Sequence, residues 1–202
     1  RDQAVTSTEA TTPASILLPL GSLTLLAAGS AGREVLLEIG WQNVPQRAEL
    51  DDLLRRLESS EAPDAPLRTE LSRRIASVVH DAAGHLTISS LTAPSVPTYA
   101  LVAAGATLVV RLHGPVVEWL LVDAAELRRL VALAADGSPD LSIVASCGGE
   151  ARAGVHLGGG RLRTAARRPA DLDQLRISSL GDGLGALVEL VLAATAPTSE
   201  ER

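Results

Sequence analysis

The spacing of apolar side chains predicts two amphipathic helices in the first half of the chain. From Arg47 to Ser59, leucines recur at three- and four-residue steps among acids and arginines, which is typical of a helix with one buried face. The segment Glu61 to Pro66 breaks this pattern, and a second helix is predicted from Leu67 to His80. The buried stripe expected for the second helix is Leu71, Ile75, Val78 and Val79.

Aliphatic runs between Gly- and Pro-containing turns predict the strands. The expected strands are Ile16 to Ala27 (bent, or divided into a hairpin, by Pro19 and Gly21), Glu34 to Ile39, His85 to Leu91, Thr98 to Ala103, Ala106 to Leu112, Val116 to Val122 and Leu141 to Ala145. Further helices are expected from Asp123 to Ala135 and from Leu184 to Ala194. The Gly- and Arg-rich stretch after Cys147 predicts a mobile loop.

The strongest pattern has the order strand, helix, strand, in the segments Ala106–Leu112, Asp123–Ala135 and Leu141–Ala145. Both strands are apolar on both faces, which favours parallel pairing within a sheet covered by helices. We therefore expect an α/β fold with a mostly parallel central sheet flanked by helices. A chain of 202 residues, 46% of them hydrophobic, is long enough for one core.

The expected domain organisation is one α/β domain with irregular ends. Residues 1–14 are rich in Thr, Ser, Ala and Pro and predict a flexible leader. The single domain is expected over 15–197, followed by a disordered tail over 198–202. The apolar run from Ile16 to Gly29 is interrupted by Pro19 and Gly21, so it predicts neither a signal peptide nor a transmembrane segment, and localisation stays open.

Charge and aromatic content argue against a nucleic-acid partner. The net charge of −6 is spread without a basic stripe, and the aromatic residues are two Trp and one Tyr, which offer no platform for stacked bases. No membrane partner is expected either. The single cysteine, Cys147, excludes an intramolecular disulfide and a Cys-rich zinc site, and is either a small buried side chain or a reactive thiol.

Two chemistry-bearing residues follow directly on apolar strands. His113 is followed by Gly114, and Cys147 by Gly148 and Gly149. Because the carboxyl ends of parallel strands meet at one edge of a sheet, we expect His113-Gly114 and Ser146-Cys147-Gly148-Gly149 to lie side by side. Such a site contains a thiol, an imidazole base and, at Gly114, Cys147 and Gly148, backbone N–H groups that bind an oxyanion.

These segments resemble the caspase-like (clan CD-type) cysteine peptidases. A hydrophobic strand ending in His-Gly, then a helix, then a hydrophobic strand ending in Ser-Cys is most similar to CHAT domains and to the cysteine protease domains of autoprocessing toxins. The matching text is Thr107–Gly114, Leu121–Leu130 and Leu141–Gly149. Pro115 after the His-Gly pair, and the absence of a recognisable specificity signature after Gly149, depart from the family pattern.

The resemblance implies a caspase-like three-layer sandwich in which His113 is the base and Cys147 the nucleophile. It implies a cysteine endopeptidase acting by a His-Cys dyad in limited or self-proteolysis, as part of a larger polypeptide. Its partner would be a polypeptide substrate, its own parent chain included, and it would need no metal or cofactor.

Other interpretations stay open. The domain is alternatively a catalytically inactive scaffold or interaction domain, or a generic α/β domain whose Gly158–Gly160 and following arginines bind an anion, although a solvated loop is favoured there. A metal site combining Cys147, His113 and His156 lacks further ligands of suitable spacing. His80 and His85 flank a turn at the end of a predicted helix and are interpreted as surface residues beside that turn.

Overall fold

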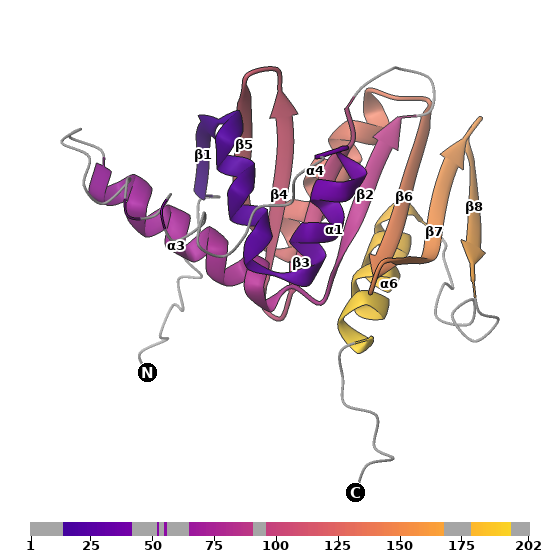
Figure 1. The fold of residues 1–202 in the computed structure, drawn as a ribbon. Helices are drawn as coiled ribbons and strands as arrows, with labels where there is room; N and C mark the ends of the chain where they lie inside the picture. Colours follow the sequence, from indigo (N-terminus) through magenta and orange to yellow (C-terminus); the bar gives the residue numbers. More distant parts are fainter. Residues whose placement is uncertain are drawn as a thin grey trace, which may run out of the picture.

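The computed structural model describes residues 14–41, 52, 55, 65–90, 96–167 and 179–194, which form one sheet with helices on both faces (Figure 1). The strands are β1 (Ala14–Pro19), β2 (Gly84–Ser90), β3 (Thr98–Ala103), β4 (Ala106–His113), β5 (Val116–Val122), β6 (Asp140–Cys147), β7 (Glu150–Gly158) and β8 (Arg161–Ala166). The helices are the 3-10 helix η1 (Leu20–Ala28), α1 (Ser30–Glu38), α3 (Ala65–Asp81), α4 (Ala124–Asp136) and α6 (Leu180–Ala193).

The sheet is antiparallel throughout. Its 8 strands lie in the order β1-β5-β4-β3-β2-β6-β7-β8, and every neighbouring pair is antiparallel. The expected caspase-like, mostly parallel central sheet is therefore wrong. Strands that are apolar on both faces indicate a sheet covered on both sides, and an antiparallel sheet between two helical layers satisfies the same pattern.

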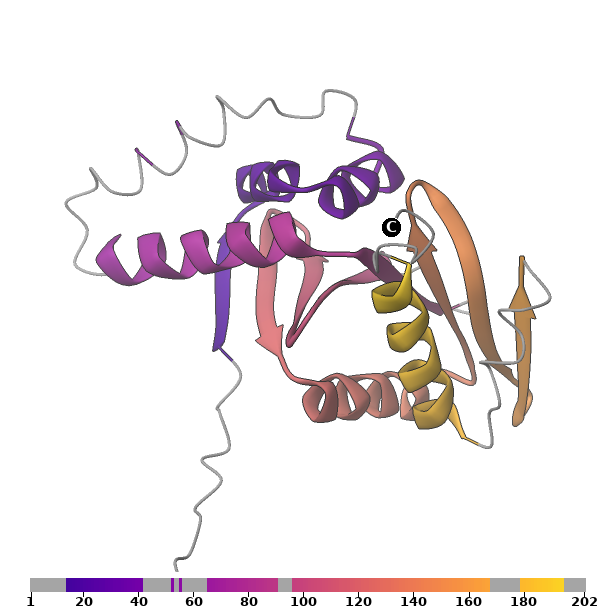
Figure 2. The same ribbon diagram turned by 90° about the horizontal axis from the view of Figure 1, so that it is seen from below.

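Helices cover the two faces unequally (Figure 2). One core packs η1, α1 and α3 against β1, β3, β4 and β5, and includes Trp119, Leu101 and Val79. The core on the opposite face packs α4 and α6 against the middle of the sheet and extends to β7 through Ala153 and Val155. Of the helices in the described part of the chain, none is long and apolar enough to cross a membrane.

Most predicted elements are confirmed. The helix predicted from Leu67 to His80 is α3, where Ile75 and Val79 are buried. The strand predicted from Thr98 to Ala103 is β3 and that from Val116 to Val122 is β5. Asp123 caps α4, its side chain accepting a hydrogen bond from the N–H of Glu126 at 2.8 Å.

Three predictions of local structure are wrong. The expected strand from Ile16 to Ala27 ends at Pro19 and continues as η1. The expected strand from Glu34 to Ile39 is helical, because the buried residues of α1 (Ala31, Gly32, Val35 and Leu36) recur at helical spacing. The expected mobile loop after Cys147 is a hairpin of two strands, β7 and β8.

Several predictions fall outside the described residues. The flexible leader lies almost wholly within residues 1–13, and the tail lies within 195–202. Of the helix predicted from Arg47 to Ser59, only Asp52 and Arg55 are described; both are helical, and their side chains form an ion pair at 3.2 Å.

Candidate functional site

The structure does not bring His113 and Cys147 together. One row of register partners crosses β4, β3, β2 and β6 and consists of Val110, Tyr99, Thr87 and Val144, in that order. His113 lies three residues after Val110 and Cys147 three residues after Val144, but β4 and β6 run in opposite directions. The two residues are therefore separated by about 14 Å across the sheet and roughly 20 Å along it. The expected side-by-side placement is wrong.

The hairpin strand β5 is the physical reason. It reverses the chain between β4 and the helix α4, so that β5, not β4, runs parallel to β6. Strands β4, β3 and β2 lie between β5 and β6, so this crossover does not join neighbours. His113 lies at the opposite edge of the sheet from Cys147, where its Nε2 is 3.2 Å from the carboxylate of Glu118.

Cys147 is a buried side chain of the core. It is 4% exposed, and its Sγ packs against the backbone of Gly84, where an added Cβ would lie 2.9 Å from the sulfur. Burial raises the pKa of the Cys147 thiol; the charge of Glu34 raises it further, and Arg152 opposes both. A thiol with a raised pKa is a poor nucleophile near neutral pH.

The glycines expected to form an oxyanion site lie in hairpin turns. Gly148 and Gly149 have φ of 61° and 74° and form the two-residue turn between Cys147 and Glu150. Positive φ at both central residues is the geometry of a type I′ turn, which glycine adopts without strain. Gly114, with φ 61°, begins the turn between His113 and Val116. These glycines are explained by chain reversal.

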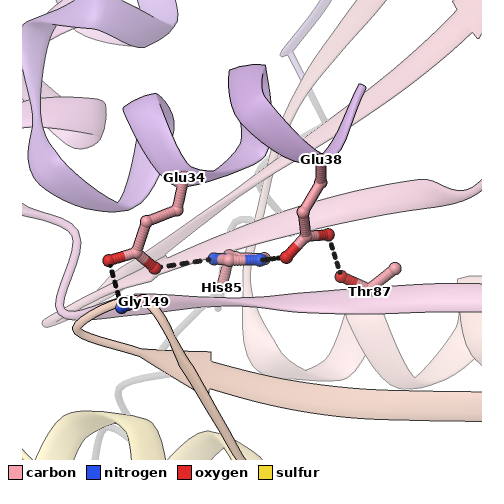
Figure 3. A network of polar contacts seen from close by, with 5 residues as sticks. All are labelled: Glu34, Glu38, His85, Thr87 and Gly149. Carbon is pink, nitrogen blue, oxygen red and sulfur yellow. Dashed lines mark hydrogen bonds and ion pairs between the residues drawn. The ribbon is translucent and has the colours of Figure 1, made fainter. Parts of the chain in front are cut away.

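A different polar cluster joins α1 to the middle of the sheet, and we call it the acid–histidine clamp: Glu34, Glu38, His85, Thr87 and Gly149 (Figure 3). His85 is completely buried and lies between two carboxylates of α1. Its Nε2 is 2.8 Å from Glu38 Oε1, and its Nδ1 is 3.6 Å from Glu34 Oε2. A carboxylate only accepts, so Nε2–H donates to Glu38.

Each carboxylate of the clamp also has a second partner. Thr87 Oγ1 donates to Glu38 Oε2 at 3.0 Å, and the N–H of Gly149 donates to Glu34 Oε1 at 2.6 Å. The clamp therefore connects three parts of the fold: α1, β2 and the turn between β6 and β7. Glu34 Oε2 and His85 Nδ1 are buried without a hydrogen bond in the structure.

The pKa values of two side chains at the clamp, Glu38 and Tyr99, are shifted. The hydrogen bond from His85 lowers the pKa of Glu38; burial acts in the opposite direction, while the charge of His85 and the bond from Thr87 lower it further. Burial raises the pKa of Tyr99, and the negative charge of Glu38 adds to that effect. An ionised Glu38 beside His85 is therefore the favoured state near neutral pH.

The clamp has the parts of a catalytic pair but lacks access to a substrate. A histidine held by a carboxylate is a common arrangement in active sites, yet the His85 side chain is 0% exposed and both its nitrogens face acids. Within the described residues, no group of three or more His, Cys, Asp or Glu side chains is placed to hold a metal ion. We assign the clamp a structural role.

Sequence reasoning missed the clamp for two reasons. His85 was expected at the surface, where a predicted strand begins beside a turn, whereas its side chain is completely buried in β2. Glu34 and Glu38 were expected in a strand, where their alternation would place them on one face without a histidine beside them. The spacing of Ala31, Val35 and Leu36 was a usable signal, because it indicates a helix, in which Glu34 and Glu38 lie on one face.

The β6–β8 end of the sheet has a surface that the described helices do not cover. Ala153, Val155 and Leu157 of β7 face the core under α6, so the alternate residues face the other side. We call that side the open face; its residues include Asp140, Ser142, Val144, Gly154, His156, Gly158, Arg161, Arg163 and Ala165. All are partly or fully exposed, and Figure 2 shows no helix on the side of β7 and β8 that faces away from α6.

A cleft at the end of α4 has fewer reactive side chains than the clamp. It is lined by aliphatic residues and by serines and a threonine, and its Ser90 and Ser138 hydroxyls bond each other at 2.7 Å. No titratable residue lines it among those described. The described lining of the cleft therefore has hydroxyl groups but no acid or base that could activate them.

No family model, curated protein sequence or solved structure matches this chain.

Proposed function

We propose that this protein is a non-catalytic interaction domain that binds another polypeptide at the open face and at the adjoining edge strand β8. The observation that carries this proposal is the unequal covering of the sheet. Two helical layers bury the strands from β5 to β2, while the open face of β6, β7 and β8 carries no described helix. A partly apolar sheet surface with a free edge is a common site for peptide recognition.

The burial of Cys147, the candidate nucleophile, also favours a non-catalytic role. Cys147 is buried, its pKa is raised, and no described imidazole lies on its side of the sheet next to it, because His85 faces away. Cysteine-peptidase activity stays a prediction, which the rate of alkylation of Cys147 tests separately.

A peptide-display selection tests the proposed function. A library of random peptides is selected on the domain, and binders are counter-screened against Ala165→Trp, which places a large side chain on the open face where Ala165 is exposed. The matched control is Ser77→Trp on the exposed side of α3. We expect enriched peptides that lose binding to the Ala165 variant only. A selection without enrichment, or with binders indifferent to Ala165→Trp, would contradict the proposal.

A further inference from the structure

We propose that β8 binds an acidic, extended segment of another protein as a ninth strand of the sheet. This inference rests on the proposed interaction function and adds the chemistry and geometry of the partner. β8 is an end strand of the sheet order, so one side of its backbone has no partner strand in the described structure. Unpaired N–H and C=O groups along an edge accept an added strand.

The register shows which groups of β8 are available. The N–H of Arg167, directly after β8, donates to Arg152 O in β7 at 2.8 Å. The backbone N–H groups of successive residues point to opposite sides of a strand. Those of Arg161, Arg163 and Ala165 therefore point inward, towards β7, as that of Arg167 does. The register agrees with this assignment: Gly158 and Arg161 close the two-residue turn between β7 and β8, so the N–H of Arg161 points towards β7. Leu162, Thr164 and Ala166 therefore present their N–H groups outward.

The side chains along this edge favour an acidic occupant. Arg161 and Arg163 are exposed on the open face, and neither forms an ion pair with another described residue. Arg167 differs, since it is paired with Glu150 at 2.6 Å. Asp140 also faces this side, in the register row of Gly158 and Arg161, and lies near His156, so it offsets part of the positive charge of the two arginines. Because the whole chain carries a net charge of −6, two free arginines on one strand mark a local reversal of sign.

Arg161 and Arg163 also disfavour a second copy of this chain as the strand that pairs with β8. Two β8 strands paired in antiparallel fashion would bring Arg161 and Arg163 of both copies onto one face of the ladder. Like charges on neighbouring strands are destabilising, whereas Glu or Asp at those positions would attract. Charges on edge strands also serve merely to prevent association. A purely protective role predicts no binding of any strand, which separates it from our proposal.

The probe is a capped peptide in which Glu and Val alternate, as long as β8, which has 6 residues. Binding to the full chain is measured by NMR titration, with a Lys-Val peptide of the same length as the comparison. The charge variant is Arg161→Glu with Arg163→Glu, and its matched control is Arg74→Glu with Arg128→Glu on the exposed sides of α3 and α4. We expect the charge variant to weaken binding by about tenfold or more and the control to leave it unchanged.

A backbone variant tests strand addition itself. Thr164→Pro removes an outward N–H and spares the bonds between β8 and β7, whereas Arg163→Pro removes an inward one. We expect Thr164→Pro to abolish binding of the Glu-Val peptide while circular dichroism and thermal unfolding stay near those of the parent. Hydrogen exchange should show protection of the Leu162, Thr164 and Ala166 amides when the peptide is bound.

Each contrary result has a distinct meaning. Equal binding of the Lys-Val peptide overturns the acidic partner, and binding that survives Thr164→Pro overturns strand addition. Protection of the outward amides without peptide, together with a concentration-dependent dimer in sedimentation, assigns the edge to a second copy instead. If display yields non-acidic peptides that need the open face, the interaction function stands and this inference fails. If display yields none, the proposed function fails first.

Discussion

The two ends of the sheet are built from similar strands but are covered differently. From β5 to β2, helices pack on both faces, and residues such as Leu101, Leu108 and Val109 are at most 1% exposed. In β7 and β8, one face packs towards α6 and the other is open. The difference shows in the sequence as continuous apolar runs at the covered end and as two-residue alternation at the open end.

This comparison separates what stabilises the fold from what is free to bind. The covered end contains the buried aromatic residues Trp119 and Tyr99 and the acid–histidine clamp. The open end contributes to stability through one face only, so substitutions on its other face should alter binding more than folding.

The largest effect is expected at the clamp. His85→Ala should lower the free energy of unfolding by about 3 kcal/mol, because it leaves a cavity and removes a buried hydrogen bond to a charged group. The comparison variant is His156→Ala on the open face, where a change within about 0.5 kcal/mol is expected. Urea unfolding followed by circular dichroism measures both variants. Equal losses of unfolding free energy would contradict the view that the covered end stabilises the fold more than the open face does.

Two valines in the same register row form a closer comparison. Val110 and Val144 lie on the same side of the sheet, but Val110 is 0% exposed and Val144 belongs to the open face. Val110→Ala should cost about 2 kcal/mol of unfolding free energy, and Val144→Ala about 1 kcal/mol or less. A loss at Val144 as large as that at Val110 would mean that the open face is covered in solution.

Acid should weaken the clamp through Glu38. Its folded-state pKa lies below the ordinary value of 4.5, so its stabilising contribution is present above that pH and is lost as the pH falls through the folded pKa. The effect should be under about 1 kcal/mol, because the side chain is 38% exposed and solvent screens it. Glu38→Gln should flatten the urea-unfolding profile between about pH 5 and 3. An unchanged slope would show that Glu38 is not the titrating group.

The smallest expected effect is that of His113 on the thiol. Cys147 should react slowly with iodoacetamide, with a midpoint above that of a free thiol, and His113→Ala should leave the rate unchanged. The rate is measured in the native protein from about pH 5 to 9. Fast labelling with a low midpoint that is lost in the variant would instead establish a Cys-His dyad and revive the peptidase prediction.

The sequence was sufficient for elements with strong local signals. The apolar stripe of α3 and the Asp123 cap of α4 depend on residues within a few positions of one another, and both were predictable. Strand β7 was also predictable in principle. Ala153, Val155 and Leu157 alternate with Gly154 and His156 between two Gly-Gly turns, which is a hairpin pattern that composition alone obscures.

The candidate site was less accessible to sequence reasoning. His113 and Cys147 do end apolar strands, as predicted. Their separation depends on the direction of each strand and on the strands placed between them, and no local pattern carries that information. The clamp likewise joins Glu34 and Glu38 to His85, about fifty positions later in the chain, through the packing of α1 on β2.

What the sequence by itself determined is the set of helices and strands with clear periodicity, the tight glycine turns and the need for a sheet covered by helices. Only the tertiary structure decided the antiparallel order, the burial of His85 and Cys147, and the open face beside β8. The physical reason is that periodicity reports whether a side chain is buried, whereas strand order and direction depend on which distant surfaces pack together.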